Sequence, residues 1–415
     1  MFRANLQRTG SQDIDITVNA ISGYQWRLND FKLASSDKTI VFESGYLYCL
    51  ATRIDAMFAS FYQIDAEEGK INWSLKINQP IFGASDYFSS PVIVDELAYF
   101  LYQPMLQNLR PALFCINLSR REFQFSLDIF ELIDSNFENT FADSWKFMTR
   151  SSVTIVDGSI YIGTINGCIC CFEAETGIFQ WKLALSSDYG IGYLAYSNGL
   201  VFAESGGGEV YAIDIFSKSI NWKLNFSEFR KSTYNWDVCP IVANGNVYSF
   251  SRDKTLSAID MQTGRLNWQY SVSGQSYCSH FVASGEMLIG KMADFQIHAV
   301  DLNSGKKVWS IDIGQPMPPK SPPLVSGTVL FTSCGGHFLG IDTASSKIIF
   351  KWEIPFRFEK FLDVEYLVTQ SLNLAEKVTS GRPKLSYISS PCITKDSIFI
   401  ATENAADLAL FKLGI

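Results

Sequence analysis

The sequence of 415 residues predicts an all-β protein, a single eight-bladed β-propeller that spans residues 1–415 and is built of four-stranded antiparallel blades. Three observations predict it. A segment that ends in tryptophan recurs along the chain, a tight turn between apolar stretches recurs eight times, and the strand missing from the last repeat occurs near the N-terminus. Repeats of this size with four short strands are typical of WD40-like propeller blades.

The recurring segment consists of an apolar residue, an acid, a turn and then tryptophan, spaced about 41–46 residues apart where no insertion intervenes. We expect the aromatic ring to be buried between adjacent blades and the acid to cap its turn. The acids of the pattern are Asp65, Asp214, Asp260, Asp301 and Asp342. The expected docking residues, with phenylalanine in two weaker copies, are Trp26, Trp73, Phe125, Trp181, Trp222, Trp268, Trp309 and Phe350.

The tight turns supply the second observation, because dipeptides such as Asn198–Gly199 and Asp157–Gly158 suit a two-residue hairpin. The flanking stretches are rich in β-branched and aromatic residues, as strands are. Each unit therefore contains four strands, which we name A to D. The expected blades are residues 36–77, 88–128, 150–186, 193–226, 238–273, 279–314, 321–355 and 387–415 plus 21–29.

Ring closure is the third observation. The last unit stops after its strand C at Leu408–Phe411, whereas Gly23–Leu28 has the pattern of a strand D. We expect this N-terminal strand to complete the final blade, which would close the ring and remove open sheet edges.

The amino-acid composition disfavours some classes of binding partner. Lys and Arg total 34 against 42 Asp and Glu, and the net charge of −8 disfavours nucleic acid and anionic membrane surfaces. No apolar run approaches the roughly 20 residues of a membrane helix, so we expect no membrane insertion. The nine cysteines have no framework spacing and favour a reducing compartment. We expect a cytoplasmic protein, or an exported one whose signal peptide is not in this sequence.

The pattern of acid, Thr or Ser, Gly and Trp resembles the tryptophan-docking repeat of the quinoprotein (PQQ-type) propeller superfamily. The lead-in Phe2–Asn5 with Arg8–Gly10 is also similar to that of such proteins. The resemblance covers nearly the whole chain, and in character it is closest to non-catalytic PQQ-like repeat proteins such as the outer-membrane assembly lipoprotein, an interaction scaffold. Because a fold does not fix a function, the superfamily's dehydrogenases remain an alternative.

The dehydrogenases of this superfamily bind pyrroloquinoline quinone with calcium, and many carry a disulfide between adjacent cysteines. Cys170–Cys171 invites the comparison, but both lie within the strand pattern, where neighbours face opposite sides of a sheet. The three histidines, His280, His298 and His337, lack zinc-like spacing. We therefore expect no catalytic, cofactor-binding or metal-binding residue, and neither PQQ nor calcium. Gly206–Gly208 suits a hairpin better than a phosphate loop.

Insertions distinguish the two faces of the predicted ring. The longest, residues 126–149 and 355–385, connect strand D to the next strand A, and two shorter ones, Thr52–Ser60 and Gln103–Pro111, connect strands B and C. All four project from one face, the insertion-bearing face, and such clustering favours function. The candidate partner loop, which could equally be a flap packed over the rim, contains Phe356, Phe358, Phe361, Leu362 and Tyr366.

Residues just before each strand A should surround the mouth of the central channel on the same face. Aromatic and charged groups that converge on a funnel form a candidate ligand site, although they could simply line the mouth. They are Tyr87, Lys146, Arg150, Tyr189, Trp236, Asp237, Tyr277, Lys320 and Tyr387.

These features favour a non-catalytic propeller that acts as a protein-interaction scaffold and binds a protein or peptide through its insertion-bearing face, as a monomer or in a complex. One alternative is an enzyme that uses the channel funnel, such as a PQQ-dependent dehydrogenase. A second is a sensor of small ligands or saccharides. A deletion of the Phe356–Leu385 insertion would separate a partner-binding loop from a flap.

Overall fold

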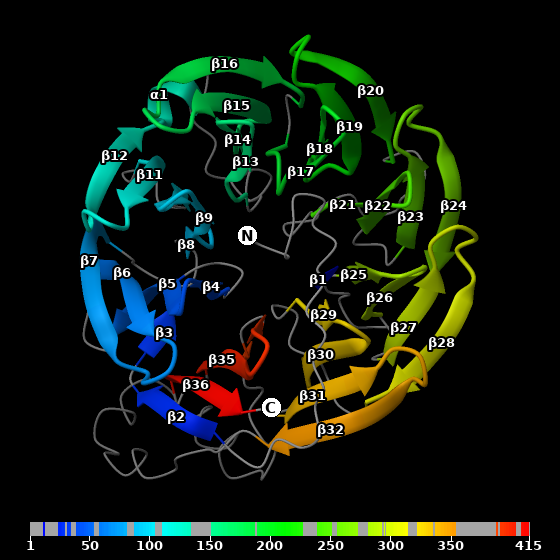
Figure 1. The fold of residues 1–415 in the computed structure, drawn as a ribbon. Coiled ribbons are helices and arrows are strands. Elements are labelled where there is room, and N and C mark those ends of the chain that lie inside the picture. The colour runs from blue at the N-terminus through cyan, green and yellow to red at the C-terminus, as the bar shows by residue number, and fades with distance from the viewer. Residues whose placement is uncertain are drawn as a thin grey trace, which may run out of the picture.

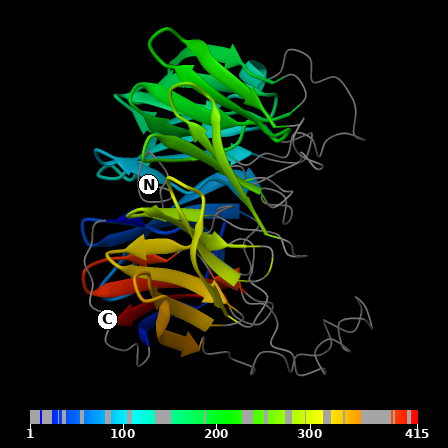
Figure 2. The same ribbon diagram turned by 90° about the vertical axis from the view of Figure 1, so that its right-hand side faces the viewer.

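In this computed structural model, eight antiparallel sheets surround a central axis, which confirms the predicted eight-bladed propeller (Figure 1). The strands cross the thickness of the ring (Figure 2). The described residues are 11–12, 24–29, 31–34, 39–53, 58–80, 87–103, 110–133, 151–186, 189–226, 239–250, 255–272, 281–292, 294, 296–313, 322–334, 337–353, 387–388, 391–403 and 408–414. Within these ranges, α1 (Phe130–Ile133) is the one α-helix, and no helix is long and apolar enough to cross a membrane.

Blades 3 to 6 each consist of four strands in consecutive order from the channel outward. Positive φ angles at both turn residues, 52° at Asn198 and 78° at Gly199, form the A–B hairpin that the sequence predicts. The strands are β13 (Thr154–Val156), β14 (Ser159–Gly163), β15 (Cys168–Glu173) and β16 (Phe179–Ala184); β17 (Ala195–Ser197), β18 (Leu200–Glu204), β19 (Glu209–Asp214) and β20 (Ser219–Asn225); β21 (Ile241–Ala243), β22 (Asn246–Phe250), β23 (Thr255–Asp260) and β24 (Leu266–Ser271); and β25 (Phe281–Ser284), β26 (Met287–Lys291), β27 (Gln296–Asp301) and β28 (Lys307–Asp312).

In blades 1, 2 and 8, two short segments share the innermost position and pair with the same strand B. In blade 2 the interruption falls at Ser89–Pro91, where the Ser89 hydroxyl accepts a hydrogen bond from the Leu101 amide at 3.0 Å. The strands are β3 (Phe31–Leu33), β4 (Val41–Glu43), β5 (Tyr46–Arg53), β6 (Phe58–Asp65) and β7 (Ile71–Pro80); β8 (Tyr87–Phe88), β9 (Val92–Val94), β10 (Leu97–Gln103), β11 (Ala112–Asn117) and β12 (Glu122–Asp128); and β33 (Tyr387–Ile388), β34 (Cys392–Ile393), β35 (Ser397–Glu403) and β36 (Leu408–Gly414).

Blade 8 is completed by the N-terminal segment, as the sequence predicts. Strand β2 (Tyr24–Asn29) pairs antiparallel with β36 and forms the outer edge of the blade, so that Trp26 lies opposite Lys412. Figure 1 shows β2 beside β36, on its outer side. The ring is therefore closed by hydrogen bonds between distant parts of the chain.

Blade 7 contains an addition that the sequence does not predict. Its own strands are β29 (Leu324–Ser326), β30 (Val329–Cys334), β31 (His337–Asp342) and β32 (Lys347–Glu353). A further short strand, β1 (Ser11–Gln12), pairs in parallel with β29 on the channel side.

The core lies between the blades as well as within them. One cluster joins Ile169 and Cys171 of blade 3 to Val201 and Tyr211 of blade 4. Strand C is buried except at its ends, as in β15, where Cys168–Phe172 are buried and both faces of the sheet contact a neighbouring blade. This explains its continuous apolar sequence, which is characteristic of strands covered on both sides.

A register shift recurs between strands C and D. In blade 4, Ala212 pairs with Trp222 but Ile213 pairs with Ile220, so that Asn221 is the extra residue of a β-bulge. The shift recurs at the corresponding place in all eight blades. A bulge increases the local twist of a strand and re-aims its side chains, here immediately before the docking aromatic residue.

Candidate functional site

The joints between blades contain the repeated tryptophans. The indole nitrogen of Trp222 donates a hydrogen bond to the Met261 carbonyl of the next blade at 2.9 Å. Trp268 and Trp309 do the same to Leu302 and Thr343, both at 3.1 Å. Each indole thus contributes apolar contact and a directional bond to its neighbour.

The turn that receives the indole explains the acid and the glycine of the repeat. In blade 5 the Asp260 carboxylate accepts hydrogen bonds from the Thr263 hydroxyl and amide, both at 2.8 Å, and these bonds lower the pKa of the carboxyl. Gly264 has φ +69°, and a Cβ there would lie 2.7 Å from the Trp222 ring. The turn therefore needs glycine both for its backbone and for close approach of the indole.

Two joints depart from the pattern. In blade 2 the Phe125 ring packs against Gly177 of blade 3, where a Cβ would lie 3.1 Å from it. In blade 7, Phe350 packs over Gly340 of its own sheet, and Trp352 contacts Phe411 of blade 8 edge-on with centroids 5.8 Å apart. Two further docking residues pack on aromatic rings of their own blades, Trp73 on Phe61 and Trp181 on Tyr161.

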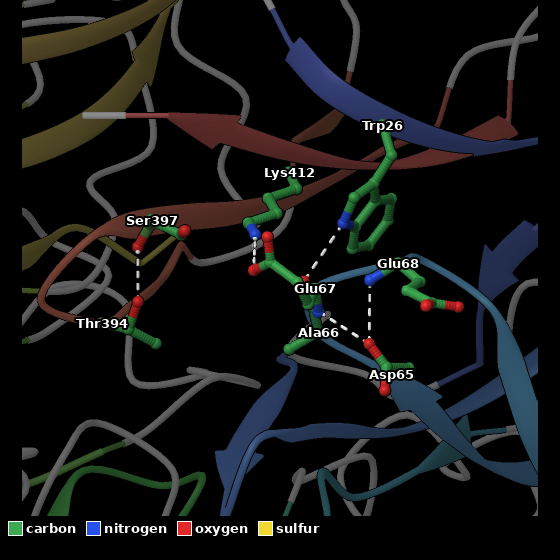
Figure 3. Close-up of polar contacts among 8 residues, drawn as sticks. All are labelled: Trp26, Asp65, Ala66, Glu67, Glu68, Thr394, Ser397 and Lys412. Atoms are coloured by element: carbon green, nitrogen blue, oxygen red, sulfur yellow. Dashed lines mark hydrogen bonds and ion pairs between the residues drawn. The ribbon is translucent and has the colours of Figure 1, made fainter.

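The closing joint combines three segments of the chain (Figure 3). The Trp26 indole donates to the Ala66 carbonyl of blade 1 at 3.1 Å. Lys412 replaces the small residue that faces the tryptophan in blades 4 to 6, and its ammonium group pairs with the Glu67 carboxylate. The Lys412 side chain is 4% exposed and that of Glu67 is 85% exposed. A cation thus links the C-terminal strand to the first blade.

Most of the candidate funnel lies outside the described residues: Lys146, Arg150, Trp236, Asp237, Tyr277 and Lys320. The candidate partner loop, Phe356, Phe358, Phe361, Leu362 and Tyr366, also lies outside them. Tyr87 and Tyr387 belong to the inner strands β8 and β33. Tyr189 lies against the Gly206–Gly208 turn, where a Cβ on Gly207 would lie 2.3 Å from its ring. The triple glycine is a hairpin turn that accommodates this tyrosine.

Polar clusters occupy the ends of strands on the insertion-bearing face, and each is particular to its blade. In blade 4 the Glu209 carboxylate accepts a hydrogen bond from the Tyr211 hydroxyl at 2.8 Å and pairs with Lys223 at 2.6 Å. Burial opposes ionisation of Glu209, but bonds from Lys223, Tyr211 and Ser205 outweigh it and lower the pKa of the carboxyl. The group is held as a carboxylate.

A second cluster bridges blades 5 and 6. The Tyr270 hydroxyl lies 2.7 Å from His298 Nδ1, and His298 Nε2 lies 3.0 Å from an Asp294 carboxylate oxygen. Burial lowers the pKa of His298, although Asp294 acts in the opposite direction. The neutral ring suits both contacts, because its Nε2–H donates to the carboxylate while Nδ1 accepts from tyrosine.

Two buried polar contacts also join neighbouring blades near this face. The Ser249 hydroxyl of blade 5 donates to the buried Glu204 carboxylate of blade 4 at 2.8 Å. The buried Lys291 ammonium of blade 6 donates to the Ser333 carbonyl of blade 7 at 3.0 Å. Sequence analysis did not identify any of these polar contacts, because each depends on the offset between adjacent sheets.

Cys170 and Cys171 are the described residues that invite comparison with the adjacent paired cysteines of quinone-dependent dehydrogenases. Cys170 and Cys171 face opposite joints, between blades 2 and 3 and between blades 3 and 4, so they are not placed to pair as adjacent cysteines. Burial raises the pKa of the Cys170 thiol to about 12, which disfavours the thiolate. Within the described ranges, no group of three or more His, Cys, Asp or Glu is arranged to hold a metal ion.

The fold and the joints define a PQQ-like propeller with eight blades, and comparison with known proteins specifies the family. The family model described as "Outer membrane protein assembly factor BamB" matches residues 166–410, more than half of the chain, and the chain belongs to this family. The BamB of Moranella endobia (strain PCIT) is 25% identical over 205 residues, 47% of this chain and 52% of that protein. The BamB of Yersinia pestis is 21% identical over 208 residues, 48% of this chain and 52% of that protein. The chain thus spans about half the length of these curated relatives.

Solved structures show the same architecture. The structure of BamB from Moraxella catarrhalis has a TM-score of 0.58 at 14% identity, with 95% of this chain and 97% of that chain covered. A europium-containing methanol dehydrogenase has a TM-score of 0.68 at 10% identity, with 100% and 97% covered. Since BamB and a methanol dehydrogenase share the fold, these likenesses establish the architecture alone.

Proposed function

We propose that this chain is a non-catalytic scaffold that takes part in the assembly of outer-membrane proteins and binds a protein partner through its insertion-bearing face. Membership of a family described as an outer-membrane protein assembly factor supports the role in assembly. The contrast between the faces supports the choice of the insertion-bearing face as the binding surface. The opposite face repeats one turn from blade to blade, whereas the insertion-bearing face carries the long connections and the blade-specific polar clusters.

The same relatives support an exported protein over the cytoplasmic alternative, since they are named as outer-membrane assembly factors. The cysteines favour a reducing compartment in the sequence, but the structure offers another reason for them. Five of the seven described free cysteines are buried, and four of these belong to clusters that join neighbouring blades: Cys49, Cys115, Cys170 and Cys171. Free cysteine at such positions acts as a small apolar residue.

The test compares strains of the organism of origin that lack this protein or produce variants of it, and measures folded β-barrel proteins in the outer-membrane fraction. One variant replaces residues 355–385 with a short Gly-Ser linker. The matched control is Phe216→Ser, which removes an exposed apolar side chain from the opposite face. Circular dichroism of each purified variant checks that the ring folds.

We expect loss of the protein to lower the amount of β-barrel proteins, the linker variant to behave like the loss, and the Phe216 variant to behave like the unaltered protein. Unchanged levels after loss of the protein would refute the assembly role. Full activity of the linker variant would instead refute residues 355–385 as the contact surface and leave the assembly role standing.

A further inference from the structure

The inner edge of blade 7 carries a strand from outside the blade. Ser11 pairs with Val325 and Gln12 with Ser326, in the one parallel pairing between strands of the described residues. Figure 1 shows β1 near the centre of the ring, beside β25 and β29. The N-terminal segment thus reaches the channel before β2 completes blade 8 at the outer rim.

An inner strand is a natural acceptor for such a segment. In blades 3 to 6 the inner strand A is the edge of its sheet and pairs with strand B, whereas β29 of blade 7 pairs with β30 on one side and with β1 on the channel side. In blade 7, Pro322 and Pro323 precede β29 and have no N–H, which limits the donating part of this edge to Leu324–Ser326. The short length of β1 agrees with this limit.

Burial differs between blades at the end of the inner strand. Ser326 of blade 7 is 0% exposed. Ser197 of blade 4 and Ser284 of blade 6 occupy the equivalent position before the A–B turn and are half-buried. The inner edge of blade 7 is covered where β1 lies alongside it.

We infer that the channel-facing edge of β29 is an acceptor site for an extended peptide that pairs with it in parallel, and that the chain's own Ser11–Gln12 fills this site. Recognition through backbone hydrogen bonds is the general mode by which a peptide adds a strand to an exposed sheet edge. This inference does not rest on the proposed role in outer-membrane assembly, because the site and its occupant belong to one chain.

The experiment measures binding of a fluorescein-labelled peptide with the sequence of residues 6–17, by fluorescence anisotropy. It uses three proteins: the full chain, a form without residues 1–12 that keeps β2, and the full-length double variant Ser11→Pro with Gln12→Pro. We expect saturable binding to the last two and at least roughly ten-fold weaker binding to the unaltered chain. The matched control peptide carries the same two prolines, which cannot donate to the edge.

Hydrogen exchange provides a second measurement on the folded proteins. The amides of Leu324–Ser326 should exchange faster in the double-proline variant than in the unaltered chain, and the labelled peptide should restore their protection. Absence of peptide binding to all three proteins, equal binding to all three, or equal binding of the proline control peptide would each overturn the inference.

Discussion

The two faces of the ring differ in how regular their contacts are. The face that carries the A–B and C–D turns repeats one arrangement, in which an aspartate caps a turn, a glycine admits an indole, and the indole donates to the next blade. On the insertion-bearing face the polar contacts differ from blade to blade: Glu209 with Lys223, His298 with Asp294 and Tyr270, and Ser249 with Glu204. The repeated face holds the ring together, whereas the insertion-bearing face differs between blades, as the proposed recognition of a partner requires.

The largest effect should come from disturbing the repeated face, and two glycines of blade 5 provide a matched pair. Both have positive φ, +69° at Gly264 and +71° at Gly245, but only Gly264 lies against an indole. Gly245→Ala should cost about 1 kcal/mol, because alanine is strained in this conformation. Gly264→Ala should cost about 3 kcal/mol, because the Trp222 ring must also move and weaken its packing. Urea unfolding measures both.

Equal losses of stability for the two alanine variants would show that the indole does not press on the turn. Trp222→Phe gives an independent control, since it removes the hydrogen bond to Met261 and keeps most of the aromatic contact.

A smaller effect is expected at the buried contact between blades 4 and 5. Ser249→Ala removes the hydroxyl that donates to the Glu204 carboxylate, and loss of a donor to a buried charged group costs roughly 2 kcal/mol. The control position is Ser257, which is buried on the neighbouring strand β23. Ser257→Ala removes a hydrogen bond that the exposed Gln269 side chain donates to the serine hydroxyl, and no charged group is involved. Thermal unfolding should separate the two variants, and equal shifts would argue against a special role for the Glu204 contact.

The closing joint should respond differently to its two charged partners. Glu67→Gln leaves the buried Lys412 ammonium without its carboxylate and should destabilise the ring by about 1 kcal/mol. Lys412→Met replaces the cation with an apolar side chain of similar length and should be close to neutral, because a well-packed apolar residue often substitutes for an ion pair. Urea unfolding measures the change in the free energy of unfolding for each variant. A larger loss of stability for Lys412→Met than for Glu67→Gln would contradict this prediction.

The smallest effect is the pH dependence that His298 contributes. Burial lowers the pKa of its imidazole in the folded chain, with Asp294 and Lys307 as the charged neighbours and Tyr270 as the second contact. The unfolded chain therefore binds a proton at higher pH, so this contribution to stability is present above the ordinary pKa of about 6.5 and is lost as pH falls through the folded value.

Urea midpoints measured between pH 7.5 and pH 5 should therefore fall more steeply for the unaltered chain than for His298→Gln. Parallel curves for the two proteins would show that His298 does not titrate differently on folding.

Sequence reasoning succeeds where the chain repeats. The spacing of Trp222 and Trp268, the turn at Asn198–Gly199 and the strand around Trp26 each encode local structure, and local patterns suffice to predict blades and their closure. Contacts that depend on how one sheet is offset from the next cannot be predicted in this way. The pairing of Lys412 with Glu67 joins residues 345 positions apart, and β1 has too few residues to show a periodicity.

The difference between the faces can be tested most directly at the two ends of one hairpin in blade 4. Asn225 ends β20 at the insertion-bearing face, and Phe216, 77% exposed, lies in the C–D turn at the other. A photo-cross-linking amino acid placed at either position, in cells that produce the protein, reports which face touches a partner. The account predicts a discrete cross-linked protein from position 225 and none from position 216. A cross-link from position 216 alone would contradict it.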